Sequence, residues 1–365
     1  MLRRFFSPNF IYGSSHLSIS SKQNPPFWPS LSLPSGCFCE KMSSTAATAA
    51  GAEAGAQKST HLTEASPLIS TDELERNLGK YKILDATWVK LPMWAGRDAW
   101  KEFCESRIPG AFFFDIDEVA DTRSEYPHML PSEEQLAGFL TQHGIQTEDH
   151  IVCYDSHGVV TSPRVWWTLK VFGLPNVFVL DGGLKKWKAE GRRTESGDPP
   201  KTPSISEDPS VTSGPVKANL KVALQKEGVR SYEEIRALQQ KLHSSGDSEL
   251  KDHELIVDAR PRGRFDGTLP EPREGIPSGH FAFSVNLPAN EMCDVETGAF
   301  LSKEKIRKLA EEQGVDLDRR IICSCGSGIT AATVFLALSL LGKTTNISLY
   351  DGAWTEWQMR QLKKK

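Results

Sequence analysis

The sequence predicts an α/β protein made of two similar domains, each with a parallel β-sheet flanked by helices. The first observation is a repeat: Cys153 and Cys323, like Asp181 and Asp351, stand 170 positions apart, with no gap in between. A period this long indicates a duplicated domain rather than a solenoid. The second is that short apolar runs alternate with amphipathic stretches, which is typical of βαβ units. The third is the length of 365 residues, which suits two domains of roughly 100–200 residues.

Composition excludes several classes of protein. Lys and Arg number 43 against 47 Asp and Glu, for a net charge of −4, so no basic excess predicts a nucleic-acid partner. No apolar run is long enough for a transmembrane helix, and we expect no membrane partner. Seven cysteines without repeating spacing do not form a disulfide framework, which favours a reducing compartment. No His/Cys cluster has zinc-ligand spacing, and we expect no metal and no cofactor.

Residues 1–60 are predicted to be a transit peptide followed by a disordered, low-complexity segment. The first 39 residues contain Arg3 and Arg4, many serines and no acidic residue, a composition typical of organellar transit peptides. An unstructured tail without an address is the alternative. Because Leu2–Phe6 can begin a basic amphipathic helix, a mitochondrial location is the first choice and a plastid the second. Initiation at Met42 would give a cytoplasmic product.

The first domain is predicted over residues 67–191. A capping box at Ser70 starts a helix, and a strand is expected over Lys82–Thr87. A second Ser-x-x-Gln capping signal at Ser132 opens a helix over residues 133–143, which Gly144 ends.

A linker is predicted over residues 192–220, and the second domain over residues 221–362. The linker is rich in Pro, Ser and Asp. In the second domain a capping box at Ser231 starts a helix, and a strand at Leu255–Arg260 matches the first-domain strand. A buried-type strand follows at Arg319–Cys323.

The chemistry is expected at the turn between that last strand and the next helix, which is predicted from Ala331. The turn reads Cys325, Gly326, Ser327, Gly328, Ile329 and Thr330. A glycine-containing turn that leads from a parallel strand into a helix directs backbone N–H groups inward. These donors and the helix dipole favour a thiolate, so Cys325 is the candidate nucleophile. A phosphate-binding turn or an inert cysteine are the alternatives.

The two copies differ at this turn. The position that matches Cys325 is Asp155 in the first domain, and a carboxylate cannot act as a sulfur nucleophile. One active and one inactive domain are therefore expected. Cys323 should lie within the strand and be structural.

The repeat, the cysteine turn and the ending Asp351-Gly352-Ala353-Trp354-x-x-Trp357 resemble the rhodanese superfamily. Within it, the sequence is most similar to the 3-mercaptopyruvate sulfurtransferases, from about Pro67 to Arg360. The resemblance implies two tandem rhodanese-like domains, the first inactive and the second catalytic, with the site between them.

The resemblance also implies roles for individual residues. Cys325 matches the catalytic cysteine that carries sulfur as a persulfide, and Ser327 matches a serine that assists proton transfer. His128 and Asp117 of the first domain match residues that face the turn. The substrate-binding set is Arg264, Arg273, Gly326, Gly328, Ile329 and Thr330. Without the resemblance, the two arginines would be interpreted as solvated surface residues.

The turn favours 3-mercaptopyruvate as the sulfur donor. Thiosulfate-type rhodaneses have two cationic residues where Gly326 and Ser327 stand here, and a neutral turn leaves room for an organic thiol. The arginine pair would hold its carboxylate through forked hydrogen bonds. The expected acceptors are cyanide, small thiols or thioredoxin, with release of pyruvate.

Three other functions are compatible with parts of the sequence. Thiosulfate:cyanide sulfurtransferase activity and a non-catalytic persulfide sensor or sulfur-carrier scaffold stay open. A dual-specificity phosphatase is excluded, because it needs an arginine six residues after its cysteine and Ala331 stands there.

One segment departs from the family pattern. The usual Gly-His-Ile-Pro-Gly-Ala is replaced by a run that contains Phe281, Ala282 and Phe283, whereas the first domain keeps Pro109 and Gly110. Because a Pro-Gly turn is lost, we expect altered backbone geometry there.

Overall fold

The structure is a computed structural model that describes residues 66–199, 220–244 and 253–364. The predicted transit peptide and low-complexity segment lie outside the described residues, as do positions 200–219 of the predicted linker. The described part covers the first predicted domain and, apart from residues 245–252, the second.

Each domain contains a five-stranded sheet, and the two sheets have equivalent strand orders, β1-β5-β4-β2-β3 and β6-β10-β9-β7-β8. All strand pairs are parallel. The strands of the first sheet are β1 (Leu68–Ile69), β2 (Tyr81–Asp85), β3 (Ala111–Phe113), β4 (His150–Tyr154) and β5 (Val177–Leu180). Those of the second are β6 (Val229–Arg230), β7 (Leu255–Asp258), β8 (Val285–Asn286), β9 (Ile321–Ser324) and β10 (Ile347–Tyr350). The predicted α/β fold with two parallel sheets is confirmed.

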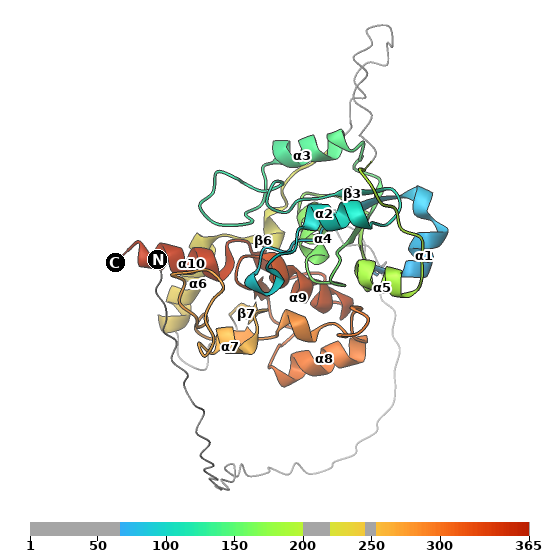
Figure 1. The fold of residues 1–365 in the computed structure, drawn as a ribbon. Helices are drawn as coiled ribbons and strands as arrows, with labels where there is room; N and C mark the ends of the chain where they lie inside the picture. Colours follow the sequence, from blue (N-terminus) through green and yellow to red (C-terminus); the bar gives the residue numbers. More distant parts are fainter. Residues whose placement is uncertain (1–65, 200–219, 245–252, 365) are drawn as a thin grey trace, which may run out of the picture. The chain divides into compact units, whose positions relative to one another are not determined.

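Helices flank both sheets (Figure 1). The first domain has α1 (Thr71–Arg76), α2 (Ala99–Glu105), α3 (Glu133–Gln142), α4 (Ser162–Val171) and α5 (Gly183–Ala189). The second has α6 (Tyr232–Ser244), α7 (Arg262–Phe265), α8 (Lys303–Glu312), α9 (Ile329–Leu340) and α10 (Ala353–Leu362). Short 3-10 segments are η1 (Leu78–Lys80), η2 (Pro92–Trp94), η3 (Lys226–Gly228) and η5 (Ala289–Glu291).

The predicted capping residues stand at the starts of three helices. The Ser70 hydroxyl accepts a hydrogen bond from the backbone N–H of Glu73 at the start of α1. Ser132 and Gln135 form a reciprocal capping box at the start of α3. Ser231 and Glu234 form an equivalent capping box at the start of α6. Each side chain thereby satisfies an N–H group that the helix leaves unpaired.

Two predicted boundaries at the cysteine turn were wrong. The strand is β9, Ile321–Ser324, instead of Arg319–Cys323, because Ser324 still pairs with Asp258 of β7. The helix α9 begins at Ile329 instead of Ala331, after Gly328 adopts a left-handed backbone with φ of 83°. Ile329 and Thr330 therefore belong to the first turn of the helix and shorten the loop.

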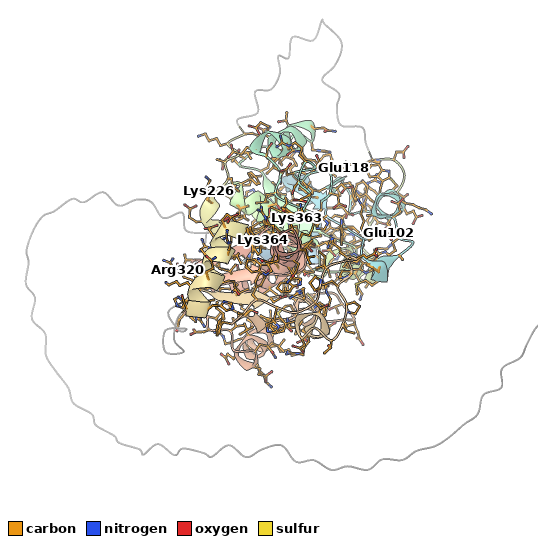
Figure 2. The ribbon with its side chains drawn as sticks, turned by 90° about the vertical axis from the view of Figure 1, so that its left-hand side faces the viewer. Glu102, Glu118, Lys226, Arg320, Lys363 and Lys364 are labelled. Carbon is orange, nitrogen blue, oxygen red and sulfur yellow. The ribbon has the colours of Figure 1, made fainter. Side chains whose placement is uncertain are left out.

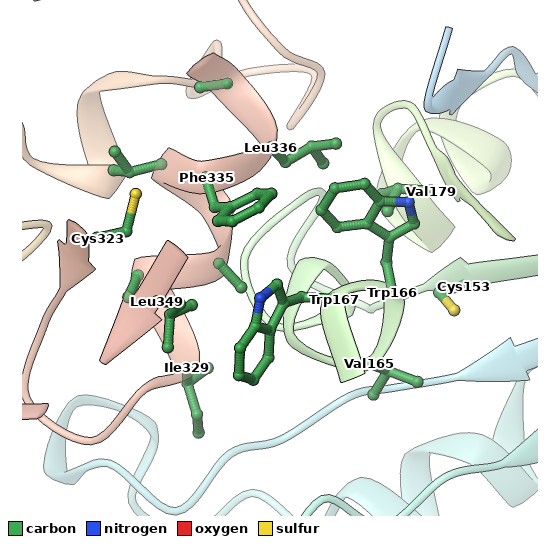
Figure 3. Packing of buried hydrophobic residues seen from close by; sticks show 14 of the residues in the cluster. Cys153, Val165, Trp166, Trp167, Val179, Cys323, Ile329, Phe335, Leu336 and Leu349 are labelled. Carbon is green, nitrogen blue, oxygen red and sulfur yellow. The ribbon is translucent and has the colours of Figure 1, made fainter. Parts of the chain in front are cut away.

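One hydrophobic cluster runs through both domains. Its centre is the contact between α4 and α9, where the rings of Trp166 and Phe335 lie 6.0 Å apart, edge to face. Figure 3 shows these two rings with Trp167 and Leu336 around them. Nearly every residue of α9 is buried, as expected for a helix that is apolar on all sides. The helix that follows the cysteine loop is therefore fixed inside the core.

The turn that lost its Pro-Gly pair keeps its backbone geometry, contrary to expectation. The N–H of Ser284 donates to the carbonyl of Phe281 at 3.2 Å, as the N–H of Ala111 donates to Ile108 at 3.1 Å in the first domain. Phe283 takes a left-handed backbone, with φ of 60°, where the first domain has Gly110 at 76°. Packing of the flanking segments maintains the turn although its residue is unsuited to it.

The described start of the predicted linker contacts the first domain, where Glu195 forms a two-bond antiparallel bridge with Arg107. Beyond the gap, Gln225, in the segment predicted as the start of the second domain, also contacts the first domain, because its N–H donates to the carbonyl of Val171 at 2.7 Å. Part of the segment predicted as a linker is therefore packed chain.

The surface carries charged side chains of both signs, among them Glu118, Lys226, Arg320 and Lys363 (Figure 2). In the described part of the chain, no helix is both long and apolar enough to cross a membrane.

Candidate active site

Cys325 directly follows β9 and is the first residue of the loop that leads to α9. It is buried, with 2% of its surface exposed. The backbone N–H groups from Gly326 to Ile329 make no hydrogen bond within the described residues. They are available to a bound anion, and the N-terminus of α9 adds its partial positive charge. The predicted turn therefore has the geometry of an anion-binding loop, and the Cys325 thiol lies at its first residue.

The matching loop of the first domain holds an anion of its own. One carboxylate oxygen of Asp155 accepts hydrogen bonds from the N–H groups of Val160, Thr161 and Ser162 at 2.8 to 3.0 Å. The other oxygen accepts from the N–H of His157 at 3.0 Å. The Asp155 carboxylate thus accepts the N–H groups of its own loop.

Three predicted residues form a continuous chain across the two domains. His128 Nδ1 lies 3.0 Å from the Ser327 hydroxyl, and His128 Nε2 lies 3.1 Å from Asp117 Oδ1. His128 is buried in the segment between β3 and α3, with a left-handed backbone. This geometry lets the imidazole hold a proton on Nε2 for Asp117 and accept the hydroxyl proton on Nδ1.

Burial and charge set the protonation of this chain. Burial lowers the pKa of His128 below its ordinary value of 6.5, although the hydrogen bond and charge of Asp117 oppose the change. Burial acts to raise the pKa of Asp117. Hydrogen bonds from His128, Lys90 and Trp88 outweigh this effect and hold the pKa of the carboxyl well below its usual range. A neutral imidazole beside an ionised carboxylate follows at neutral pH.

Cys323 and Cys153 are unlike Cys325. They are fully buried in β9 and β4, and burial raises the pKa of both thiols far above the ordinary value. Both stay protonated at neutral pH, in keeping with a structural role.

The two predicted substrate arginines have different surroundings. Arg264 donates from Nε to Glu271 Oε2 at 3.0 Å and forms a second bond to the same oxygen from Nη2. The guanidinium of Arg273 forms no hydrogen bond or ion pair with any residue that the structure describes, and burial lowers its pKa below the ordinary value. Arg273 also lines a pocket of about 510 Å³, together with Tyr126 and Met359.

Sequence reasoning missed the residues that hold these groups in place. Glu271 binds Arg264, and Lys90 and Trp88 bind Asp117. Glu271 lies between the two predicted arginines, at Glu271-Pro272-Arg273, so an acid within a basic segment was the available signal.

A buried arginine of the first domain reaches the cysteine loop, and it was also missed. Arg164 of α4 donates to the carbonyls of Gly328 and His128 and to Asp351 Oδ1 at 2.7 Å. Asp351 Oδ2 accepts the N–H of Leu130 at 2.8 Å. The signal was a cation beside the apolar run Val165-Trp166-Trp167.

Among the described residues, no group of three or more His, Cys, Asp or Glu side chains is arranged to hold a metal ion.

The family comparison matches both domains. The model of the Rhodanese-like domain matches residues 70–190 and 238–360. Among curated proteins, the chain is 40% identical over 282 residues to human 3-mercaptopyruvate sulfurtransferase, covering 76% of this chain and 85% of the human protein. It is 37% identical over 297 residues to Thiosulfate/3-mercaptopyruvate sulfurtransferase 1, mitochondrial, of Arabidopsis thaliana, covering 80% of this chain and 76% of the relative.

Solved structures give the same result. The yeast Tum1 protein superposes with a TM-score of 0.68 at 32% identity, covering 80% of this chain and 95% of Tum1. The 3-mercaptopyruvate sulfurtransferase SseA of Escherichia coli superposes with a TM-score of 0.65 at 29% identity, covering 80% of this chain and 99% of SseA.

Proposed function

The chain belongs to the rhodanese family, and we propose that, as a sulfurtransferase, it moves sulfur from 3-mercaptopyruvate through a persulfide on Cys325 to a thiophilic acceptor. The observation that carries the proposal is a thiol at the start of a loop whose N–H groups have no acceptor among the described residues, with Ser327, His128 and Asp117 hydrogen-bonded in sequence beside it. The names of the human and bacterial relatives support the same donor.

The first step is attack of the Cys325 thiolate on the donor sulfur. A sulfur–sulfur bond forms, the carbon–sulfur bond breaks, and its electron pair goes to the enolate of pyruvate. Arg273 holds the donor carboxylate, because its guanidinium forms no ion pair with any residue of the described chain and can make a forked contact with a carboxylate. The free N–H groups of the loop stabilise the charge on sulfur.

The second step moves one proton. The proton that leaves the donor sulfur must arrive on the enolate carbon to give pyruvate. Ser327 passes it, with the neutral His128 as the accepting base and Asp117 fixing the imidazole tautomer.

The third step regenerates the thiolate. A nucleophile attacks the outer persulfide sulfur, and the sulfur–sulfur bond breaks with its electron pair returning to Cys325. Cyanide would leave as thiocyanate, and a small thiol or thioredoxin would leave as a persulfide. The reaction needs no cofactor or metal, because Cys325 itself carries the sulfur.

The test is the mass of the protein after incubation with 3-mercaptopyruvate. A gain of one sulfur atom on the Cys325 peptide, lost again on addition of cyanide, is the expected result. No gain would refute the proposal. A gain without steady release of pyruvate and thiocyanate would favour a persulfide sensor or sulfur carrier.

Thiosulfate is the second candidate donor. A rat relative at 36% identity over 283 residues is named thiosulfate sulfurtransferase, and the Arabidopsis names combine both donors. The kcat/KM values for the two donors, measured on one preparation with cyanide as acceptor, separate the candidates.

We also propose that the N-terminal segment directs the protein to mitochondria. The support is its acid-free, Ser- and Arg-bearing composition and the mitochondrial Arabidopsis relative. A fluorescent fusion of the full chain should enter mitochondria, and the same fusion starting at Met42 should stay in the cytosol. Entry into plastids instead would identify the other organelle, and import of the truncated fusion would refute the proposal.

A further inference from the structure

Glu271 lies at the centre of a buried chain of charged side chains beside the cysteine loop. Its two oxygens accept hydrogen bonds from Arg264 Nε at 3.0 Å and from Arg260 Nη1 at 2.7 Å. Arg260 also binds both oxygens of Asp258 and the carbonyl of Gly279. The side chains of Glu271, Arg260 and Asp258 are at most 3% exposed. Two guanidinium groups are thereby matched to two carboxylates.

The end of this chain touches the loop. A Cβ atom placed on Gly326 would lie 2.7 Å from Arg264 Nη2 and 3.9 Å from Glu271 Oε2. Both charges are therefore next to the thiol-bearing turn. Opposite charges in contact largely cancel for a third charge that approaches them. A sulfur donor at the loop therefore experiences Arg264 and Glu271 together as a neutral ion pair. Because Nε and Nη2 of Arg264 bind Glu271, Nη1 can donate a hydrogen bond to the substrate.

Arg273 is in the opposite situation. Its guanidinium forms no ion pair with any acid of the described chain, although the charges of Asp117 and Glu271 act on it at longer range, as those of Cys325 and Arg264 do. Of the two predicted arginines, Arg264 is therefore in direct contact with a carboxylate and Arg273 is not. The loop itself, with Gly326 and Ser327, adds no cation.

We propose that Glu271 is a specificity-determining residue, which neutralises Arg264 and so adapts the site to a donor with a single negative charge. The inference rests on the proposed function. A 2-oxo acid thiol presents one carboxylate for Arg273 and one carbonyl for the N–H of Arg264. A dianion such as thiosulfate would need two uncompensated cations and finds one.

The experiment is the Glu271→Gln variant of the full chain, with kcat/KM measured for both donors and cyanide as acceptor. Gln keeps the length and an acceptor oxygen but removes the charge. The ratio of thiosulfate to 3-mercaptopyruvate kcat/KM should rise by about tenfold, the effect of one added ionic contact of ordinary strength. The rise should shrink at high salt, because ions screen the freed charge.

Two matched variants isolate the position of the charge. Asp258→Asn removes the same charge from the same buried chain, but this carboxylate binds Arg260 and not Arg264, so the donor ratio should stay unchanged. Glu271→Asp keeps the charge and should keep the ratio within about twofold of wild type. Thermal unfolding of all three variants shows which of them fold.

An unchanged ratio in folded Glu271→Gln would overturn the inference, as would an equal shift in Asp258→Asn. If Glu271→Gln does not fold, the wild-type protein still provides a test. Sulfate should compete with 3-mercaptopyruvate no more strongly than pyruvate does, and clearly tighter inhibition by sulfate would overturn the inference. If wild type gains no sulfur from 3-mercaptopyruvate, the proposed function fails first. Sulfur gain in wild type with an unchanged ratio in Glu271→Gln defeats the specificity role alone.

Discussion

At the scale of single residues, position decides which cysteine can react. Cys323 and Cys325 are two positions apart, yet one side chain is packed within β9 and the other begins the loop. The strand surrounds the Cys323 thiol with apolar side chains, whereas the loop after Cys325 offers N–H donors to a charged sulfur.

The first prediction follows from this difference. Cys325→Ser should reduce the rate of sulfur transfer by at least about a thousandfold, because a hydroxyl attacks the donor sulfur far more slowly than a thiolate does. Cys323→Ser should retain most of the activity, with some loss of stability from the buried hydroxyl. Steady-state rates with 3-mercaptopyruvate and cyanide check both. An active Cys325→Ser would show that the nucleophile has been assigned to the wrong residue.

The second prediction concerns pH. Because the folded protein depresses the pKa of His128 below 6.5, the neutral imidazole persists to lower pH than in the unfolded chain. The rate should therefore fall only at pH values below 6.5, as His128 becomes protonated and can no longer accept the Ser327 proton. The same sign applies to stability, which is full above pH 6.5 and decreases as the pH falls through the folded pKa.

The His128→Gln variant is the control for the second prediction. It should lower kcat by about a hundredfold or more and abolish the acid limb of the rate profile. If the rate of this variant still falls at low pH, the titrating residue is not His128.

The third prediction is that Arg273→Ala raises the KM for 3-mercaptopyruvate by about tenfold to a hundredfold, the loss expected for one charge-assisted contact. The KM for thiosulfate should rise less, because that donor has no carboxylate. Initial rates over a range of each donor give the comparison. Equal increases in KM for both donors would mean that Arg273 attracts any anionic donor and does not bind the carboxylate specifically.

At the scale of elements, the structure keeps a turn whose sequence has changed. Phe283 has a left-handed backbone, with φ of 60°, which costs a non-glycine residue about 1–3 kcal/mol. Its ring is 49% exposed, so little burial compensates.

The fourth prediction is that Phe283→Gly raises the free energy of unfolding by about 1 kcal/mol, measured by urea denaturation. Gly110→Ala is the mirror test in the first domain, where φ is 76° and a Cβ would meet no atom within 4 Å. It should destabilise through backbone strain alone. A destabilised Phe283→Gly would mean that the edge-to-face contact with His243 outweighs the strain.

Elements were predictable from the sequence to the extent that local physics specifies them. The capping serines fixed helix starts, and apolar runs fixed strands, because both signals act within a few residues. The start of α9 was placed too late, because the left-handed conformation of Gly328 depends on its surroundings. The pairing of Arg264 with Glu271 was missed for a similar reason: charge order along a loop does not state which side chains meet.

At the scale of the whole molecule, the two domains share buried charges as well as a core. Arg164 and Asp351 are 3% and 6% exposed as side chains, and their ion pair joins α4 to the segment before α10. The same guanidinium holds the carbonyls of Gly328 and His128. No sequence pattern specifies these partners, since they come from distant parts of the chain.

The fifth prediction is that Arg164→Met lowers the free energy of unfolding by about 3–5 kcal/mol, because Asp351 becomes an unpaired buried charge. Adding Asp351→Asn should recover part of this loss, and denaturation of wild type, both single variants and the double variant measures the coupling. Additive effects would mean that the ion pair does not link the domains energetically.

The loop of the first domain shows what the geometry of such a loop requires. Four N–H groups converge there on the Asp155 carboxylate, and burying them without an acceptor would destabilise the fold. A neutral residue at position 155 would leave these donors unsatisfied. The first domain thus carries its anion covalently, as a side chain, whereas the equivalent N–H groups after Cys325 have no acceptor among the described residues.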